Sequence, residues 1–294
     1  LAEYGVEEAV LSMGFRPDAF TDAYPQGLCA GVKLHYAVEP EPLDTAGAIR
    51  FAARDAGITE RFLVANGDVL TDLDVGELVR FHRERGAEAT IALHQVDDPS
   101  AYGVVPTDAH GRVQAFVEKP PRHEAPTDLI NAGTYVLEPS VLERIADGRK
   151  VSIEREVFPA IVADGTLYAT AGDTYWIDTG TPAMYLKAQL DLLDGLRPGD
   201  REGVAPAAVV APDAKVVRSV VGVGAHVAAG ASVTDSVVLH GARIEAGATI
   251  DRSIVGPEAV VGAGAALSEL SVLGTGIVVE AGAVLEGVRR PQPE

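Results

Sequence analysis

The chain has 294 residues and a formal charge of −19, from 24 Lys and Arg against 43 Asp and Glu. Such an acidic balance argues against a nucleic-acid or anionic-membrane surface, both of which need basic patches. Hydrophobic residues make up 47%, which is enough for a packed core, and no apolar run has the ~18 residues of a membrane span. The single cysteine, Cys29, allows no internal disulfide and, with no visible signal peptide, predicts a cytoplasmic protein.

Residues 1–195 alternate strands with helices, which predicts an α/β domain with a Rossmann-like, mostly parallel sheet. The predicted strands share short runs of branched and aromatic residues and cover residues 8–12, 34–38, 62–65, 90–94, 103–107, 113–118 and 131–137. The predicted helices share amphipathic spacing or a capping residue and cover residues 45–55, 75–85, 140–146 and 182–193. Residues 196–205 combine Gly, Pro and charges and are predicted to be a linker.

A stiff loop follows the second predicted strand and reads E-P-E-P-L-D-T-A-G from Glu39 to Gly47. Thr45 can cap the helix that starts here, and Ala46 and Gly47 are small enough for close backbone approach. Free N–H groups and the helix dipole at such a start suit a nucleotide. A capped helix without a ligand is the alternative interpretation.

A carboxylate stands just past the third predicted strand, where F-L-V-A runs into Asn66, Gly67 and Asp68. In open α/β sheets, ligands bind at the carboxyl ends of the strands, so this position favours a functional Asp68. Asp is also common in ordinary turns, and that alternative stays open.

The sequence F-V-E-K-P places Glu118 beside Lys119 at the end of another predicted strand. Successive strand side chains face opposite ways, so an ion pair between the two is not the natural explanation. Lys is a compact, mobile charge suited to a phosphate, although a solvated strand end is the alternative. Downstream, Asn131 and Gly133 offer an amide beside a residue without side-chain bulk.

The last motif of this half reads Y-W-I-D-T-G-T-P. Thr181 as N-cap and Pro182 as first helical residue predict a helix start, and Asp178 lies on the turn just before it. Trp176 is expected to pack as core or pocket wall. Asp68 and Asp178 together could hold one Mg²⁺ with phosphate oxygens, which is the usual way proteins bind that ion.

An internal repeat of 17 residues defines residues 206–294. Branched aliphatic residues recur in three series in phase: Val210, Val227, Ile244, Val261; Val216, Val233, Ile250, Leu267; Val221, Val238, Val255, Val272. Small residues such as Gly230 and Ala231 lie between them, so each unit predicts three short strands and three corners. Stacking such units gives a solenoid, and the spacing resembles the hexapeptide-repeat left-handed parallel β-helix, with about four coils expected. A Val- and Gly-rich β-sandwich is the alternative.

Together, the N-G-D, F-V-E-K-P, N-A-G and W-I-D-T-G-T-P segments, in this order, resemble the sugar-1-phosphate nucleotidylyltransferases over essentially the whole chain. The resemblance implies Asp68 and Asp178 as metal ligands and, with Lys119, as catalytic residues. It implies a set of residues against the nucleotide: Glu39, Pro42, Leu43, Thr45, Ala46, Gly47, Asn66 and Gly67. It also implies a set against the sugar phosphate: Gly103, Glu118, Lys119, Asn131 and Gly133.

The reaction implied by this resemblance is in-line attack of a sugar 1-phosphate on the α-phosphorus of a nucleoside triphosphate. Such chemistry depends on alignment and charge neutralisation, which fits a chain without a convincing covalent nucleophile. Glu39 stands where relatives face the nucleobase, and a carboxylate accepting from two adjacent guanine donors would favour GTP. The order of the two domains is most similar to members that use mannose 1-phosphate. We also expect a homo-oligomer, because the end coils of a solenoid expose strand edges.

The sequence departs from the family at two places. The glycine-rich G-x-G-T-R loop is absent, so we expect a truncated chain that is inactive alone, and Asp44 replaces the usual glycine of P-L-G-T-A-G. Both favour a non-catalytic nucleotide-sugar-binding regulatory subunit as an alternative; a glucose-1-phosphate uridylyl- or thymidylyltransferase is another. An acyltransferase β-helix is a third, but His226 and His240 have no evident acidic partner.

Overall fold

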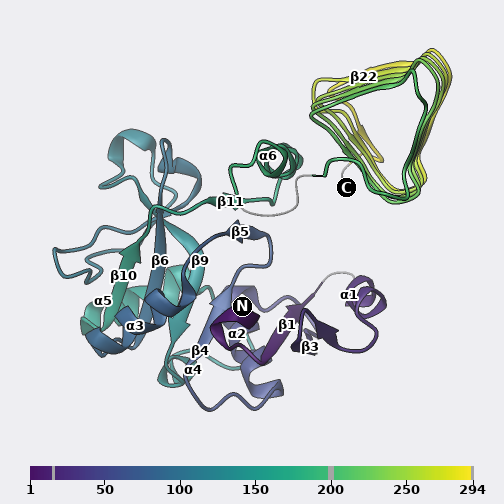
Figure 1. Ribbon diagram of the computed structural model, residues 1–294. Helices are drawn as coiled ribbons and strands as arrows, with labels where there is room; N and C mark the ends of the chain where they lie inside the picture. Colours follow the sequence, from purple (N-terminus) through teal and green to yellow (C-terminus); the bar gives the residue numbers. More distant parts are fainter. Residues whose placement is uncertain (15–16, 198–201, 293–294) are drawn as a thin grey trace. The chain divides into compact units, whose positions relative to one another are not determined.

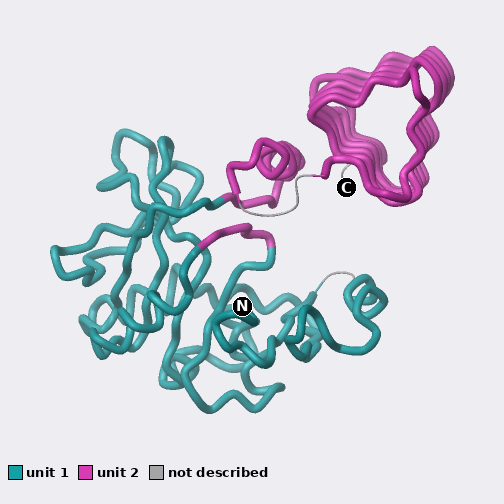
Figure 2. Tube along the Cα trace, in the orientation of Figure 1, with its two compact units in different colours: residues 1–67, 73–176 teal, residues 68–72, 177–294 magenta. Residues whose placement is uncertain are grey.

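The computed structural model describes residues 1–14, 17–197 and 202–292. The chain forms two compact units: unit 1 is residues 1–67 and 73–176, and unit 2 is residues 68–72 and 177–294 (Figure 2). The predicted linker, residues 196–205, includes residues 198–201, which lie outside the described residues, so the predicted domain boundaries stay a prediction. None of the helices in the described ranges has the length and hydropathy needed to cross a lipid bilayer.

Unit 1 contains two sheets (Figure 1). The small sheet has the order β1-β3-β2 and the larger one β10-β6-β9-β7-β8, with β4 also paired to β9. Their strands are β1 (Glu8–Met13), β2 (Leu28–Cys29), β3 (Val32–Val38), β4 (Phe62–Ala65), β6 (Ala89–Gln95), β7 (Gly103–Val104), β8 (Val117–Glu118), β9 (Leu129–Leu137) and β10 (Leu167–Ala171). The strands predicted over residues 103–107 and 113–118 are paired only at β7, β8 and a bridge between Thr107 and Val113.

Strand direction in unit 1 follows the predicted parallel pattern, with β2, β8 and β9 as the exceptions. β1 runs parallel to β3, and β10 runs parallel to β6. Both β4 and β6 run antiparallel to β9, so β4, β6 and β10 share one direction. Their carboxyl ends therefore lie at the same edge of the sheet as the amino-terminal half of β9.

Helices cover the sheets of unit 1. They are η1 (Ala2–Tyr4), α1 (Pro17–Ala23), α2 (Asp44–Asp55), α3 (Val75–Arg85), η2 (Pro99–Ala101), η3 (Arg122–Glu124), α4 (Ser140–Glu143), the π-helix η4 (Ile153–Val157) and α5 (Phe158–Asp164). α3 matches its predicted range because Asp74 caps its start and Gly86, at φ 55°, ends it. α4 ends three residues before its predicted limit, and α2 begins one residue earlier than predicted.

The core of unit 1 lies between these helices and the larger sheet. Its largest fully buried side chains include Tyr135 on β9 and Phe158 at the start of α5. The two rings meet edge to face with centroids 5.2 Å apart. This packing fixes β9, whose amino-terminal half carries Asn131 and Gly133.

Unit 2 begins with a short β-ribbon and a helix. β5 (Val69–Thr71) pairs with β11 (Trp176–Asp178), and α6 (Pro182–Leu193) follows. α6 has its predicted limits: Thr181 Oγ1 accepts a hydrogen bond from Met184 N at 3.3 Å, and Pro182 is the first helical residue.

Three five-stranded parallel sheets form the β-helix, which Figure 1 views along its axis as a triangle. The first sheet is β12 (Val209–Val210), β15 (His226–Val227), β18 (Arg243–Ile244), β21 (Val260–Val261) and β24 (Val278–Val279). The second is β13 (Lys215–Val217), β16 (Ser232–Thr234), β19 (Thr249–Asp251), β22 (Ala266–Ser268) and β25 (Val284–Glu286). The third is β14 (Val220–Val221), β17 (Val237–Val238), β20 (Ile254–Val255), β23 (Val272–Leu273) and β26 (Arg289–Arg290).

The β-helix therefore has five coils, one more than expected, because the chain after Val261 forms a further full coil although its spacing there is 18 residues, from Val261 to Val279. Val227, Ile244 and Val261 point inward as predicted and are fully buried in register. In the third series the prediction of Val272 was wrong, because Leu273 pairs with Val255 and takes the buried position. Left-handed winding is consistent with this arrangement. Outside the solenoid, Leu186 and Leu190 of α6 pack against the third sheet.

Candidate active site

The two predicted metal ligands, Asp68 and Asp178, come together in unit 2. A Cβ placed on Gly180 would lie 2.9 Å from Asp178 Oδ1 and 3.2 Å from Asp68 Oδ2. Both carboxylates thus flank the same small volume beside the Gly180 backbone. Because a side chain at residue 180 would fill that volume, glycine keeps the space between the carboxylates open.

Backbone hydrogen bonds hold this carboxylate pair. The Asp68 carbonyl accepts from Thr179 N and from Thr179 Oγ1, both at 2.8 Å. Asp178 Oδ1 accepts from Gly180 N at 2.8 Å, which closes the turn before α6. β5 and β11 pair directly next to these residues, so two motifs 110 positions apart in the sequence form one local structure. Two carboxylates in such an arrangement can bind a divalent cation together with phosphate oxygens and water.

In unit 1, Asn66 and Gly133 mark the edge where β4 ends and β9 begins. Asn66 N donates to the Gly133 carbonyl at 2.8 Å. Gly133 has φ 74°, and a Cβ there would lie 2.7 Å from Asn66 Nδ2. Glycine is therefore required at this position both by the backbone conformation and by the close approach. Asn66 and Gly67 are exposed, so the loop that leads to Asp68 is open to a ligand.

The predicted sugar-phosphate residues Gly103 and Glu118 pair across the β7–β8 hairpin. A Cβ on Gly103 would lie 2.6 Å from the Phe116 ring and 3.2 Å from Glu118 Oε2. Lys119 follows at φ 46°, a left-handed conformation that is uncommon for a side chain of this size. Its Nζ lies 4.0 Å from Glu118 Oε1, at the limit of an ion pair, and its side chain is 61% exposed. The ammonium is therefore free to reach a phosphate.

Asn131, in the amino-terminal half of β9, is held in place by two hydrogen bonds. Its Oδ1 accepts from Gly133 N at 3.0 Å, and its Nδ2 donates to Tyr135 Oη at 2.8 Å. Burial, more than the nearby charge of Glu154, raises the pKa of Tyr135, so this hydroxyl stays protonated. Gly103, Glu118, Asn131 and Gly133 thus all lie on the strands β7, β8 and β9, which are neighbours in one sheet.

An aromatic cluster next to this edge was missed by sequence reasoning. Trp176 stacks on His94 with ring centroids 5.2 Å apart and meets Tyr102 edge-on at 5.7 Å. Its Nε1 donates to the Ala132 carbonyl at 2.9 Å, so the tryptophan is anchored to β9 as a half-buried wall. Burial lowers the pKa of His94, which favours its neutral form. No spacing signal connects these three residues, because only the fold brings them together.

The predicted nucleotide loop, residues 39–47, follows the carboxyl end of β3. Several of its polar groups form hydrogen bonds within the protein, where a free group for the nucleotide was expected. Glu39 Oε2 accepts from Leu43 N at 3.0 Å and Oε1 accepts from Ser12 Oγ at 3.1 Å. Both oxygens of the carboxylate expected to face the nucleobase therefore already stabilise the loop. Pro42 is exposed at its tip, and the Leu43 carbonyl accepts from Val151 N at 3.0 Å.

The start of α2 does not offer the free N–H groups that the sequence suggested. Ala46 N and Gly47 N both donate to the Val151 carbonyl, at 2.9 and 3.2 Å. Gly47 is needed for this packing, because a Cβ there would lie 2.8 Å from Leu43 Cβ. The expectation of an open helix N-terminus for a nucleotide was wrong, since a chain segment more than 100 residues away satisfies these donors.

Thr45 is not the cap of α2. The helix begins at Asp44, and the Thr45 hydroxyl instead donates to Glu154 Oε2 and accepts from Ile153 N, both at 2.8 Å. Ser152 Oγ also donates to Glu154 Oε2 at 2.8 Å. Thr45 therefore connects the loop to the π-helix η4, a role that the sequence could not indicate.

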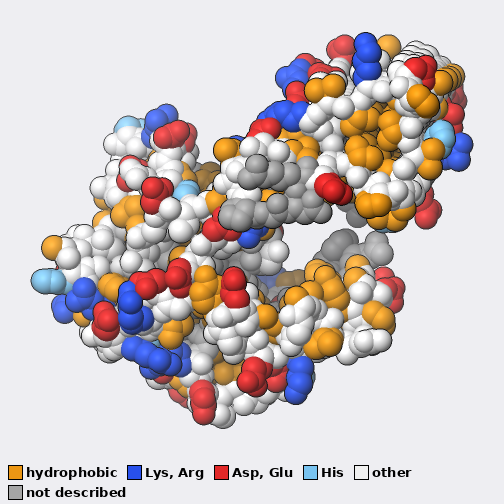
Figure 3. All heavy atoms as spheres, viewed as in Figure 1, with side chains coloured by type: hydrophobic (Ala, Val, Ile, Leu, Met, Phe, Trp, Pro, Cys, Tyr) orange, Lys and Arg blue, Asp and Glu red, His pale blue; other side chains and the backbone are white. Residues whose placement is uncertain are grey.

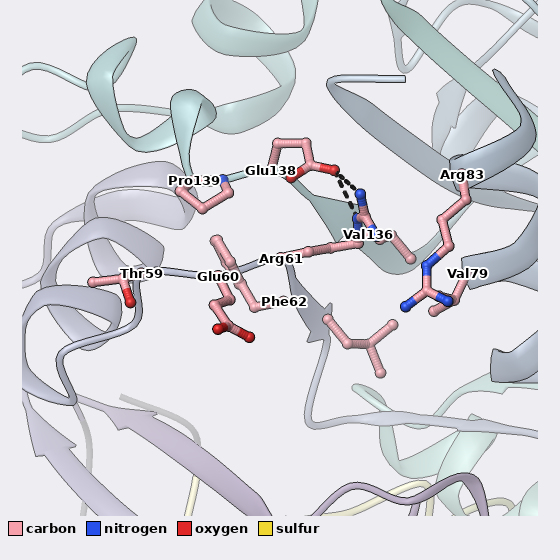
Figure 4. A pocket seen from close by; sticks show the side chains of 10 residues that line it. Thr59, Glu60, Arg61, Phe62, Val79, Arg83, Val136, Glu138 and Pro139 are labelled. Atoms are coloured by element: carbon pink, nitrogen blue, oxygen red, sulfur yellow. Dashed lines mark hydrogen bonds and ion pairs between the residues drawn. The ribbon is translucent and has the colours of Figure 1, made fainter. Parts of the chain in front are cut away.

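A separate pocket of about 460 Å³ lies at the other edge of the larger sheet (Figure 4). It is lined by the beginning of β4 and the end of β9, including Phe62 and Val136, and by Arg83 of α3. Arg61 and Glu138 form an ion pair on its wall. None of the predicted site residues lines this pocket, so it does not contribute to the candidate site.

Comparisons with known proteins agree with this architecture. Residues 1–195 match the nucleotidyl transferase family, and residues 201–289 match the family described as the GMPPB C-terminal domain. The chain therefore belongs to the nucleotidyl transferase family. The Rossmann-like domain followed by a parallel β-helix, predicted from the sequence, is confirmed.

Individual relatives carry more specific names. Mannose-1-phosphate guanylyltransferase of Mycobacterium tuberculosis is 40% identical over 235 residues, which are 76% of this chain and 65% of that protein. Mannose-1-phosphate guanyltransferase of Aspergillus oryzae is 40% identical over 212 residues, 70% of this chain and 57% of that protein. The crystal structure of HddC from Yersinia pseudotuberculosis complexed with GMP-PN has a TM-score of 0.54 and 30% identity, covering 64% of this chain and 79% of that one. The chain thus spans less than two thirds of the curated relatives' length.

Proposed function

We propose that the protein transfers a guanylyl group from GTP to mannose 1-phosphate, which gives GDP-mannose and pyrophosphate. The observation that carries this proposal is the pair of carboxylates, Asp68 and Asp178, on either side of one volume beside Gly180. The names of the curated relatives and the GMP-PN complex of HddC support guanine and mannose as the substrate groups.

Asp68 and Asp178 would hold Mg²⁺. Proteins bind this ion through one or two carboxylates and leave its other positions to phosphates and water. The described part of the chain has no cluster of three or more His, Cys, Asp or Glu that could form a complete cage, so this pair suits Mg²⁺ bound with its substrate. The bound cation would neutralise charge on the triphosphate.

The other predicted residues would position the substrates. Lys119, with its exposed and mobile ammonium, would hold the sugar phosphate. Glu118 and Asn131 would bind sugar hydroxyls, and Gly103 and Gly133 would let the sugar approach the backbone. The loop from Glu39 to Gly47, with Asn66 and Gly67, would lie against the nucleoside. In this arrangement a phosphate oxygen of the sugar attacks the α-phosphorus in line, and pyrophosphate leaves.

The test is release of pyrophosphate from GTP and mannose 1-phosphate with Mg²⁺. Asp68→Asn and Asp178→Asn should each lower kcat by at least about 100-fold, the usual scale for losing electrostatic stabilisation of a transition state. Asp173→Asn, an exposed acid near Asp178 in sequence, is the control and should keep wild-type activity. Wild-type activity in both site variants would contradict the proposal, and GTP binding without turnover in the wild type would favour a regulatory subunit.

We also infer a homo-oligomer formed through the β-helix. Its last coil, β24 to β26, has one edge without a partner strand among the described residues, and Val278 and Val284 on that coil are 65% and 67% exposed. Figure 3 shows hydrophobic side chains gathered on the end of the β-helix that faces the viewer. Exposed strand edges and apolar side chains favour association. The free thiol of Cys29 fits the cytoplasm, where we place the protein.

A further inference from the structure

We propose that Asp44 selects the nucleobase by accepting hydrogen bonds from the N1–H and 2-amino groups of guanine. This inference rests on the proposed function, because it takes the loop from Glu39 to Gly47 as the nucleoside site. It assigns a specificity-determining role to the residue at which this chain departs from the family sequence.

The position of Asp44 leaves its carboxylate open to a ligand. The residue is exposed, is the first of α2, and lies in the loop that follows the carboxyl end of β3, the sheet edge where ligands of α/β folds bind. Its Oδ1 accepts from Thr45 N at 2.8 Å, which orients the group. No Lys, Arg or His of the described chain forms an ion pair with it, so its second oxygen can accept from a ligand.

Besides Asp44, the exposed Glu41 is the other carboxylate of the loop that is open to a ligand, whereas Glu39 and the first buried amides of α2 have partners. Both oxygens of Glu39 are occupied by Ser12 Oγ and Leu43 N. The N–H groups of Ala46 and Gly47 are occupied by the Val151 carbonyl. The loop therefore presents carboxylate acceptors, which suit a base edge with donors better than a phosphate.

Guanine is the base whose edge matches a carboxylate. An ionised carboxylate only accepts hydrogen bonds, and it can accept two in parallel. Guanine offers two adjacent donors, N1–H and the 2-amino group. Adenine places the acceptor N1 beside its amino group, and uracil and thymine place carbonyls on both sides of N3–H. Each of these bases would therefore put an acceptor next to the negative carboxylate of Asp44, which repels it.

Inosine triphosphate provides a sharp probe, because it differs from GTP only in lacking the 2-amino group. Isothermal titration calorimetry with Mg²⁺ should show that the wild-type protein binds GTP about 10- to 100-fold more tightly than ITP, the value of a charge-assisted hydrogen bond. In Asp44→Gly this ratio should fall to within about threefold, and in Asp44→Asn it should fall in part. The ratio is insensitive to the general gain in triphosphate affinity expected when a negative charge is removed.

The variants are chosen to fold. Asp44 has φ 63°, a conformation that Gly adopts without cost and Asn tolerates, so both substitutions should keep the Tm. Glu60→Gln, which removes the charge of an exposed acid outside this loop, is the control and should retain the wild-type preference for GTP over ITP. An unchanged ratio in Asp44→Gly would overturn the assignment while pyrophosphate release stays intact. A wild-type protein that binds neither nucleotide would overturn the proposed function as well.

Discussion

At the scale of single residues, some side chains of the candidate site are positioned by their own strand ends and others by distant partners. Asp68 and Asp178 each follow a strand end, and the structure brings them to one point beside Gly180. By contrast, Thr45 pairs with Glu154, 109 positions away, and Glu39 with Ser12, 27 positions away. Such partners depend on tertiary packing, which no local pattern contains.

The environment of His82 is set by tertiary packing. This histidine is 1% exposed; its ring lies 2.8 Å from Thr90 Oγ1 and 3.1 Å from Glu138 Oε1. Burial lowers the pKa of His82, and the charge of Arg61 acts in the same direction, while the hydrogen bond to Glu138 opposes it. The folded state therefore keeps this imidazole neutral.

We predict that acidification destabilises unit 1 through His82. A lowered folded-state pKa means that the unfolded chain binds the proton more readily, so stability is present above the unfolded value of about 6.5 and falls as the pH drops below it. The Tm of unit 1, measured by calorimetry at pH 7.5 and 5.5, should decrease on acidification, and the decrease should be smaller in His82→Gln.

Substitution of an exposed histidine serves as the control for this measurement. His110→Gln should show the wild-type difference in Tm between the two pH values. A decrease in His82→Gln as large as in the wild type would assign the effect to other groups, of which His94, whose pKa burial also lowers, is the first to test.

At the scale of elements, the β-helix was the most predictable part, because each coil repeats the same contacts with its neighbours. The 17-residue spacing reappears as strand register, for example Val233 beside Ile250. The π-helix η4 and α5 were not predicted, since residues 153–164 mix charged residues with a proline and show no clear helical face. Nor could the alternation of strands and helices show that β9 runs antiparallel.

A row of buried serines stabilises one corner of the β-helix: Ser219, Ser236, Ser253 and Ser271. Ser236 Oγ donates to the Thr234 carbonyl at 2.6 Å and accepts from Ser253 N at 3.0 Å. Ser219 and Ser271 likewise accept from a backbone N–H of the next coil, that of Ser236 and that of Val288. The residues just before these serines, such as Asp235 and Arg252, have positive φ. At this corner the serine hydroxyl therefore supplies the hydrogen bonds that backbone pairing supplies within the strands.

Ser236→Ala should lower the free energy of unfolding of the β-helix by about 1–3 kcal/mol, because it leaves the buried N–H of Ser253 without an acceptor. Urea unfolding followed by circular dichroism measures the effect. Ser232→Ala, in the same coil but on a partly exposed strand position, is the matched control and should change little. Equal effects of the two substitutions would show that the row of buried serines does not contribute to the stability of the β-helix.

At the scale of the whole molecule, domain order and fold class followed from sequence patterns, while the division into units did not. The segment 68–72 belongs with unit 2 although residues on both sides of it belong to unit 1. This assignment arises from the pairing of β5 with β11, a contact between distant segments.

Association through the last coil gives a prediction at this scale. Light scattering at micromolar concentration should give a multiple of the 30.6 kDa chain mass, and Val278→Lys combined with Val284→Lys should reduce it to the monomer. Charged side chains at an apolar interface oppose its burial. Val217→Lys, on an exposed position of β13 in the first coil, should leave the mass unchanged. A monomeric wild-type protein would contradict the proposed assembly.

The corner at residues 268–271 shows where the solenoid can change its length. Val255 pairs with Leu273, one position further along than in the preceding coils, and Glu269 and Leu270 absorb the extra residue at φ 54° and 60°. The sheets on both sides keep their alignment, since Leu267 still pairs with Leu285. Insertions placed at this bend should therefore be tolerated, whereas one inside a strand would turn every later inward side chain toward solvent. The bend is accordingly the natural place for longer loops to arise during evolution, or to be grafted by design.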